Sequence, residues 1–201
     1  MERTTERPID RPTDRHLDRH LDRRTQILDV AARLFAERGF HGVSVGDIGR
    51  ALGVSGPALY KHFDSKDAVL AEMLVSISER LLSEGQERVA RAGDPRPALA
   101  ALVDWHVEFA LAQPPLIVVQ DRDWQSLSVD ARERVRSLQR EYVDLWVEQL
   151  RGHHATLAAD EARAMAHATF GLINSTPHSS RLPNPAMHVL LRGMALRSLD
   201  W

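Results

Sequence analysis

The chain has 201 residues, 43% of them hydrophobic, a formal net charge of −2 and no cysteine. This length predicts one large domain or a small domain joined to a larger one, and the lack of cysteine excludes disulfides, thiolate chemistry and zinc fingers. The polar N-terminal stretch and the absence of a long uncharged apolar run predict a cytoplasmic protein without a membrane segment.

Residues 8–23 read PIDRPTDRHLDRHLDR, a four-residue repeat that ends each time in Asp-Arg. The repeat has too few apolar side chains to fold by itself, so we expect a disordered arm over residues 1–23. Two interpretations of this arm stay open. It is a solvated tail, or its arginines, together with Arg23 and Arg24, follow DNA phosphates or a minor groove.

From Thr25 the apolar residues recur at helical spacing and predict a helix that ends at Gly39. Ser44 precedes a short second helix. After an interruption at Gly53-Val54-Ser55, the stretch GPALYKHF over residues 56–63 predicts a third.

A long fourth helix follows, and Asp64 or Ser65 is placed to cap it. Residues 91–97 are predicted as a linker, and residues 116–127 as a short irregular helix or turn after Pro114-Pro115. Further helices are predicted over residues 98–112, 129–151, 160–175 and 185–198. Because the sequence contains no alternating strand pattern, the predicted fold is all-α.

Residues 44–63 have the layout of a helix-turn-helix, in which two short helices meet at a tight turn around Gly53 and a serine precedes each. In this motif the second helix enters the DNA major groove and the first crosses the backbone. The side chains of this stretch bond phosphate oxygens or reach base edges, and its second helix brings its own amides. The residues expected to contact DNA are Ser44, Ser55, Gly56, Pro57, Ala58, Tyr60, Lys61, His62 and Lys66.

The base-reading face of the second helix offers few hydrogen-bonding groups. Ala58 or Pro57 is suited to thymine methyl groups, and Lys61 to guanine. Specificity therefore leans partly on DNA shape.

The stretch SVGDIGRALGVSGPALYKHFDSKDAVL resembles the DNA-binding signature of the TetR (TetR/AcrR) family of bacterial repressors, and ILDVAARLFAERGFHGVSV resembles that family's first helix and following loop. The resemblance covers roughly residues 24–75. It implies a helix-turn-helix head over residues 24–68 and a larger helical ligand-binding and dimerisation domain over residues 69–201. The family usually has alanine where Gly49 stands, so we expect a local loss of helix stability of up to about 1 kcal/mol.

Between Ala164 and Leu191 the only Asp, Glu, Lys or Arg is Arg181. Two surface helices of a monomer would carry more charges, so these helices are either a buried core pair or a dimer interface. The resemblance favours a homodimer in which two helices from each subunit form a four-helix bundle. Such a dimer sets its recognition helices about 34 Å apart and predicts a near-palindromic operator on double-stranded DNA.

In TetR-like proteins the middle helices enclose an effector pocket, which here would lie among aromatic side chains that can equally be plain core. Arg122 either binds an acidic group of the effector or lies in a solvated turn, and Asn174 and His178 can supply polar contacts. The candidate ligand-binding residues are Trp105, Phe109, Arg122, Trp124, Tyr142, Trp146, Phe170, Asn174 and His178.

The segment LIVVQDRDWQSL and the pattern from Arg136 to Trp146 are similar to regulators of fatty-acid or acyl-CoA catabolism, which suggests an acyl thioester or a lipid-like carboxylate as effector. His153-His154 lacks further ligands at a metal-binding spacing, and no nucleophile–base pattern or phosphate-binding glycine loop is visible. We therefore expect no metal, cofactor or enzymatic activity.

The sequence predicts a DNA-binding regulator, most simply a repressor that a small hydrophobic effector releases from DNA. An activator on the same scaffold stays open. So does a helical, dimeric small-molecule-binding protein whose head has lost its affinity for DNA.

Overall fold

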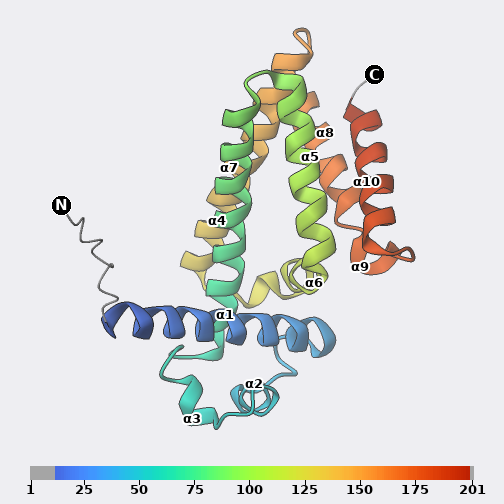
Figure 1. Cartoon of the computed structure of the whole chain (residues 1–201). Coiled ribbons are helices and arrows are strands. Elements are labelled where there is room, and N and C mark those ends of the chain that lie inside the picture. The colour runs from blue at the N-terminus through green and yellow to red at the C-terminus, as the bar shows by residue number, and fades with distance from the viewer. Residues whose placement is uncertain (1–11, 200–201) are drawn as a thin grey trace, which may run out of the picture.

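The structure, a computed structural model, describes the backbone of residues 12–199 and the side chains of residues 23–199. Every regular element in this range is a helix, which confirms the predicted all-α fold. Helix α1 (Pro12–Arg38) lies across the base of an upright helical body, and the short helices α2 (Val45–Ala51) and α3 (Gly56–Leu59) lie on its other side (Figure 1). We call α1–α3 and the start of α4 the head.

Helix α1 ends where the sequence predicts, at Gly39. This residue adopts a φ of 79°, which a glycine reaches without steric cost, and its amide donates to the Phe35 carbonyl over 2.8 Å. The helix begins earlier than the sequence pattern indicates, since residues 12–23, expected as part of a disordered arm, are helical; residues 1–11 lie outside the described residues. An established helix extends at little cost, and Arg and Asp three residues apart in the repeat have the spacing of favourable helical pairs.

Helix α3 is shorter than the predicted 56–63. It ends at Leu59, and the amides of His62 and Phe63 fold back onto the Leu59 carbonyl over 2.8 and 3.0 Å. The chain therefore turns tightly between α3 and α4, and Tyr60, Lys61 and His62 lie on this turn instead of on a helix.

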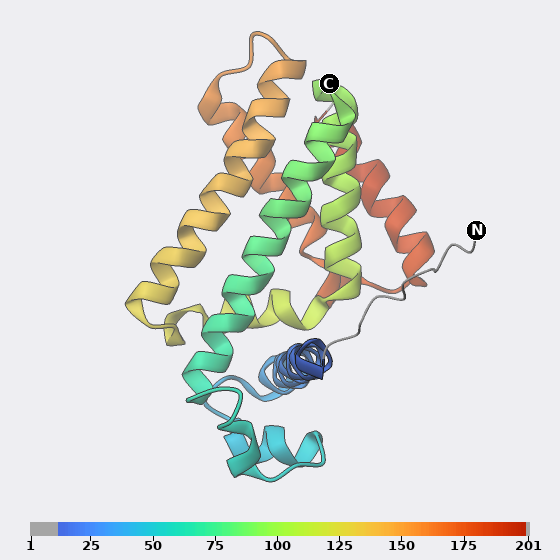
Figure 2. The same ribbon diagram turned by 60° about the vertical axis from the view of Figure 1, so that its left-hand side comes forward.

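The body consists of the upright helices and a layer of short elements beneath them (Figures 1 and 2). Helix α4 runs from the head to the far end of the body. The elements are α4 (Lys66–Ala92), α5 (Pro95–Ala112), α6 (Pro114–Asp123), the 3-10 turn η1 (Trp124–Ser126), α7 (Val129–His153), α8 (Ala159–Ile173), α9 (Thr176–Ser179) and α10 (Asn184–Leu199).

Local sequence signals explain most of these boundaries. Ser65, rather than Asp64, caps α4 by accepting from the Ala68 amide over 3.0 Å. The predicted linker over 91–97 is reduced to Gly93 and Asp94, because Pro95 begins α5 at a position where its missing amide costs nothing. The region 116–127 is more regular than expected, since it belongs to α6 and η1.

Two apolar clusters hold the molecule together, one in the body and one in the head. The head cluster draws on the first turns of α4, through Val69, Leu70, Met73 and Leu74. It also takes in buried residues of the α6–α7 region, namely Val119, Leu127 and Val135. The predicted domain boundary at residues 68 and 69 therefore falls inside a continuous helix, and the head and the body share packing.

Within the part of the chain that the structure describes, no helix combines the length and the apolar character needed to cross a membrane.

Candidate nucleic-acid interface and ligand cavity

A capping box fixes the start of α2. The Ser44 hydroxyl accepts from the Asp47 amide over 3.1 Å, and the Asp47 carboxylate accepts from the Ser44 amide over 2.9 Å. Hydrogen bonds from the Ser44 hydroxyl and amide hold the pKa of Asp47 near 2, below its ordinary 3.8. Ser44 is exposed, which is compatible with the predicted DNA contact. Its hydroxyl also caps α2 by accepting from the Asp47 amide.

The predicted DNA contacts at residues 55–58 and 60–62 lie on α3 and the turn after it, and we call this largely exposed stretch the ridge. Tyr60 is 55% exposed, and Ser55, Pro57 and Lys61 are also exposed. Gly56, Ala58 and His62 are half-buried beside them. The ridge thus presents one hydroxyl, one phenol and one ammonium group around small apolar residues, a set suited to phosphate oxygens and thymine methyl groups.

Lys66 has a different role from the one predicted. Its ammonium group donates to the carbonyls of Phe40 and Val43 over 2.8 and 2.9 Å and lies 4.2 Å from the centre of the Phe40 ring. These contacts hold the loop between α1 and α2 against the start of α4. Lys66 is half-buried, so we assign it to the framework of the head.

Arg24 is likewise engaged within the protein. Its guanidinium pairs with Glu72 on α4, donates to the His62 carbonyl and lies 4.3 Å from the centre of the Phe63 ring. Arg23 donates to the neighbouring Gln26 over 2.8 Å. Arg24, which was considered for phosphate contact, therefore joins α1 to the turn after α3 and to α4.

Gly49 permits a close approach that alanine would obstruct. It is buried, and a Cβ atom added to it would lie 2.9 Å from the Val54 carbonyl oxygen and 3.3 Å from the Gly56 amide nitrogen. The Val54 amide donates to the Gly49 carbonyl over 2.9 Å. The glycine therefore lets the turn pack tightly on α2.

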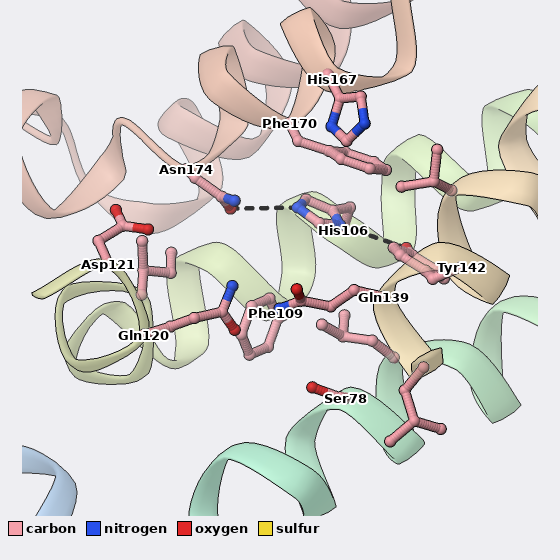
Figure 3. A pocket seen from close by; sticks show the side chains of 14 residues that line it. Ser78, His106, Phe109, Gln120, Asp121, Gln139, Tyr142, His167, Phe170 and Asn174 are labelled. Carbon is pink, nitrogen blue, oxygen red and sulfur yellow. Dashed lines mark hydrogen bonds between the residues drawn. The ribbon is translucent and has the colours of Figure 1, made fainter. Parts of the chain in front are cut away.

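The body contains a cavity of about 230 Å³ that five helices enclose. Figure 3 shows its polar side chains converging from α4, α5, α6, α7 and α8. Its lining residues are Ser78, Leu81, His106, Phe109, Ile117, Gln120, Asp121, Leu138, Gln139, Tyr142, Val143, His167, Phe170 and Asn174.

His106 is the central polar side chain of the cavity. It is buried, and its ring stacks between those of Tyr142 and Phe170, with ring-centre distances of 5.8 and 4.7 Å and interplanar angles of 15° and 16°. Burial lowers the pKa of His106 to about 4, although the hydrogen bond to Asn174 opposes this change. At neutral pH the imidazole is therefore uncharged.

The hydrogen bonds around His106 are consistent with one tautomer. Nε2 lies 3.2 Å from Asn174 Oδ1, which only accepts, so Nε2 carries the proton. Nδ1 then accepts from the Tyr142 hydroxyl over 3.3 Å, and burial keeps that hydroxyl protonated by raising its pKa. The chain from Tyr142 through His106 to Asn174 is neutral, and it leaves the Asn174 amide nitrogen available to a ligand.

The structure brings only some of the predicted pocket residues together. Phe109, Tyr142, Phe170 and Asn174 line the cavity. Trp146 is fully buried behind it, with its ring edge-on to Phe170 at 5.0 Å.

Four of the predicted residues lie elsewhere. Trp105 donates from its indole nitrogen to the Leu81 carbonyl of α4 over 3.2 Å. Its side chain points away from the direction of His106, because adjacent helical residues point about 100° apart. Trp124 packs against the head cluster, and His178 is exposed on α9. Their prediction as pocket residues was based on residue type and on position along the chain, neither of which defines the helix face.

Arg122 is the fourth, and it joins the body to the head. Its guanidinium donates to the carbonyls of Phe35 and Ala36 at the end of α1 and pairs with buried Asp123 over 3.0 Å. The preceding residue, Asp121, lines the cavity. Helix α6 therefore touches the cavity and the end of α1 within two consecutive residues.

Sequence reasoning missed His106, the most connected polar residue of the cavity. A signal existed, because the residues three and four positions from His106 on the same helical face, Leu102, Val103, Phe109 and Ala110, are all apolar. Gln120 and Gln139 were also missed. Polar residues on half-buried helix faces are too common to single out from sequence.

The outer face of α8 and α10 is apolar and exposed. On α10, Val189, Leu190 and Met194 are 72%, 44% and 40% exposed, and on α8 the small residues Ala164, Ala168 and Gly171 are exposed. The inner faces of both helices belong to the body core. Exposed apolar side chains gathered on two neighbouring helices are typical of a protein–protein interface.

His154, considered as a metal ligand with His153, lies 2.8 Å through Nε2 from the Leu199 carbonyl. Among the residues whose side chains are described, no group of three or more His, Asp or Glu is arranged to hold a metal ion.

Comparison with known proteins identifies the family. Residues 27–73 match the family model described as bacterial regulatory proteins, tetR family, and residues 92–178 match that of the tetracyclin repressor-like C-terminal domain. The HTH-type transcriptional repressor KstR2 of Rhodococcus jostii is 36% identical over 62% of this chain and 61% of its own length. The fatty acid metabolism regulator protein of Bacillus subtilis is 20% identical over 60% and 62%.

The matched region thus spans somewhat less than two thirds of these two curated relatives. Among solved structures, a TetR-family transcriptional regulator from Bordetella parapertussis superimposes with a TM-score of 0.77 and 27% identity, covering 86% of this chain and 93% of that one. The two family models lie on the head and on the body that encloses the cavity, and together they extend over most of the described chain. The chain belongs to the TetR family of bacterial regulatory proteins.

Proposed function

We propose that the protein is a DNA-binding transcriptional regulator that acts as a homodimer, and that it is a repressor released from its operator by a small hydrophobic effector. One observation carries this proposal. The segment that matches the family's N-terminal model contains a rigidly capped helix-turn-helix whose Tyr60 and Lys61 side chains are exposed. An exposed phenol and ammonium group beside a recognition helix are suited to phosphate oxygens.

The proposed DNA contacts are Ser44 and the ridge of residues 55–58 and 60–62. Ser44, Ser55, Tyr60, Lys61 and His62 contact phosphates or base edges, and Gly56, Pro57 and Ala58 approach bases as small apolar groups. Lys66 supports this surface from behind through the Phe40 and Val43 carbonyls.

The proposed dimer forms through α8 and α10. Their exposed apolar faces would pack against the same faces of a second copy as a four-helix bundle, which removes Val189, Leu190 and Met194 from water. Two heads related by the dimer axis favour a near-palindromic operator.

Regulation follows from two states of the dimer, of which only one sets the heads at the half-site separation. An effector that binds the other state more tightly shifts the population and releases DNA. The central cavity is the proposed effector site. The names of the two curated relatives, a repressor and a fatty acid metabolism regulator, support a repressor with an acyl-CoA or fatty-acid-like effector.

A gel-shift titration on DNA flanking the protein's own gene, with acyl-CoAs added, tests this proposal. We expect binding to a near-palindromic fragment and release by an acyl compound. The variant Tyr60→Phe with Lys61→Ala should bind more weakly and with a shallower salt dependence. Failure of the wild type to bind any flanking fragment would favour a small-molecule-binding protein without an operator, and transcription that rises on binding would identify an activator.

A further inference from the structure

The cavity offers no positive charge to a ligand. Within the part of the chain whose side chains are described, neither lysine nor arginine lines it. Arg88 acts electrostatically on Tyr142, but its guanidinium pairs with Glu108 over 2.8 Å and lies 5.0 Å from the centre of the Trp105 ring. A carboxylate entering the cavity would therefore meet no partner of opposite charge.

The one carboxylate of the described lining, Asp121, acts against an anion. The Asp121 carboxylate lines the cavity and is exposed, as is His167, so these two residues lie where the cavity meets solvent. The imidazole of His106 is kept neutral by burial, and the Tyr142 hydroxyl is occupied with His106 Nδ1. A negative ligand would lose its hydration and be repelled by Asp121 with neither a lysine nor an arginine of the lining to pair with.

Neutral hydrogen-bonding groups are plentiful in the same cavity. The amides of Gln120 and Gln139 form no side-chain hydrogen bond among the described residues, and Figure 3 shows both side chains extending inward, from α6 and α7. The Asn174 amide nitrogen is also available, because its oxygen is bound to His106. Three carboxamides that can donate, set among apolar side chains, match an uncharged carbonyl on an apolar chain.

From this lining we infer that the cavity selects an apolar ligand whose polar group is an uncharged carbonyl, such as an acyl thioester, and discriminates against the corresponding free carboxylate. The inference rests on the proposed function only in placing the effector in this cavity. It distinguishes a thioester from a free fatty acid, both of which the proposed function allows as the effector. A thioester keeps its carbonyl neutral, and its charged carrier can remain outside.

Direct binding to the DNA-free protein tests the inference by isothermal titration calorimetry. The probes are butanoyl-CoA, octanoyl-CoA and palmitoyl-CoA, with the free acid and the methyl ester of the same chains. We expect the free acid to bind at least about tenfold more weakly than the thioester or the ester of the best chain length. Binding of the ester shows that the acyl carbonyl, and not the CoA carrier, is recognised.

A gain-of-function variant sharpens the test. Gln139→Arg places a cation in the cavity and should raise the affinity for the free acid about tenfold while leaving that for the ester lower or unchanged. Gln86→Arg is the matched control, since it makes the same charge change at an exposed position of α4, and it should alter neither affinity. Asp121→Asn should also favour the free acid, by a smaller factor.

Several results would overturn the inference. They are tighter binding of the free acid to the wild type, no binding of any ester or thioester, and equal effects of Gln139→Arg and Gln86→Arg. These outcomes are distinguishable from failure of the proposed function. Release of DNA by a free acid would preserve the regulator and refute the selectivity, whereas selective ester binding without DNA binding would do the reverse.

Discussion

Lys61 and Lys66 are the only lysines of the chain, and the structure gives them different surroundings. Lys61 is exposed on the ridge, whereas the Lys66 ammonium binds two carbonyls of the loop between α1 and α2. Substituting these two lysines one at a time therefore distinguishes a side chain that contacts DNA from one that stabilises the folded head.

We predict that removing Lys66 affects mainly stability, whereas removing Lys61 affects mainly DNA binding. Lys66→Ala leaves the Phe40 and Val43 carbonyls without their donor and should lower the free energy of unfolding by about 1–3 kcal/mol. Lys61→Ala should leave unfolding nearly unchanged but weaken DNA binding and reduce the slope of its salt dependence by about one. Urea denaturation and binding titrations at several salt concentrations measure both effects. Equal stability of the two variants would contradict the framework role of Lys66.

His106 should make stability depend on pH. Its pKa is lowered from the ordinary 6.5 to about 4 in the folded protein, so the unfolded chain binds a proton first as the pH falls. Stability is therefore full above pH 6.5 and is lost as the pH falls towards 4, by roughly 2 kcal/mol between pH 7 and pH 5. Urea denaturation at the two pH values measures this loss.

His106→Gln should remove much of this difference, whereas His167→Gln, at an exposed position, should retain it. Asp47, whose pKa is held near 2, stabilises the folded state above pH 3.8. This stabilisation is lost as the pH falls from 3.8 to 2, so it does not change between pH 7 and pH 5. If the glutamine variant does not fold, an NMR titration of the wild type decides the matter. Protonation of His106 near pH 6.5 would show that burial does not control it.

At the scale of elements, α6 links the cavity to the head. Gln120 and Asp121 line the cavity, and Arg122 binds the Phe35 and Ala36 carbonyls at the end of α1. Val119 on the same helix is buried in the head cluster. A ligand that displaces α6 would therefore displace α1, because one short helix carries both sets of contacts.

Arg122→Ala should weaken this connection. It removes the donor to two carbonyls and leaves the buried Asp123 carboxylate without this partner, so we expect a loss of about 1–3 kcal/mol in unfolding free energy. Ligand affinity of the free protein should change little, while the effect of ligand on DNA affinity should shrink. Arg134→Ala is the control, because its pair with Glu79 is half-exposed and contributes little. An unchanged ligand effect on DNA binding in Arg122→Ala would exclude α6 as the link.

At the scale of the whole molecule, the uncovered apolar surface of α8 and α10 decides the expected assembly. Val189→Glu puts a charge at the most exposed large apolar side chain of this surface and should convert the proposed dimer into a monomer in analytical ultracentrifugation. Val129→Glu is the matched control, since Val129 is 65% exposed at the start of α7, on a different helix. If both variants and the wild type sediment as the same species, this surface is not the interface.

Loss of the dimer should also weaken operator binding, because two linked heads bind one palindromic site far more tightly than one head does. The folded content of Val189→Glu, measured by circular dichroism, should equal that of the wild type, since the side chain is exposed in the single subunit. A monomer that still binds the full operator with wild-type affinity would contradict the symmetric arrangement.

The sequence by itself determined the long helices of the body, the turn of the helix-turn-helix and the apolar character of α8 and α10. These features depend on residues that are neighbours along the chain: the 3.6-residue period, the serine caps at Ser44 and Ser65, and the glycine that ends α1 at residue 39. The structure begins α1 at Pro12, earlier than the predicted Thr25. The apolar pattern did not indicate this start, because the repeat is poor in apolar residues and a helix can extend into such a segment once it has formed.

The tertiary structure alone decided which side chains share the cavity and which hold the framework. Trp105 and His106 are adjacent in sequence, but their side chains face different partners, and only His106 meets Tyr142 and Asn174, which are 36 and 68 residues away. Arg122 finds its carbonyl partners 86 and 87 residues away. Backbone carbonyls carry no residue-specific signal in a sequence, and the facing of helices is fixed by packing of the whole body, so neither set of contacts is determined locally.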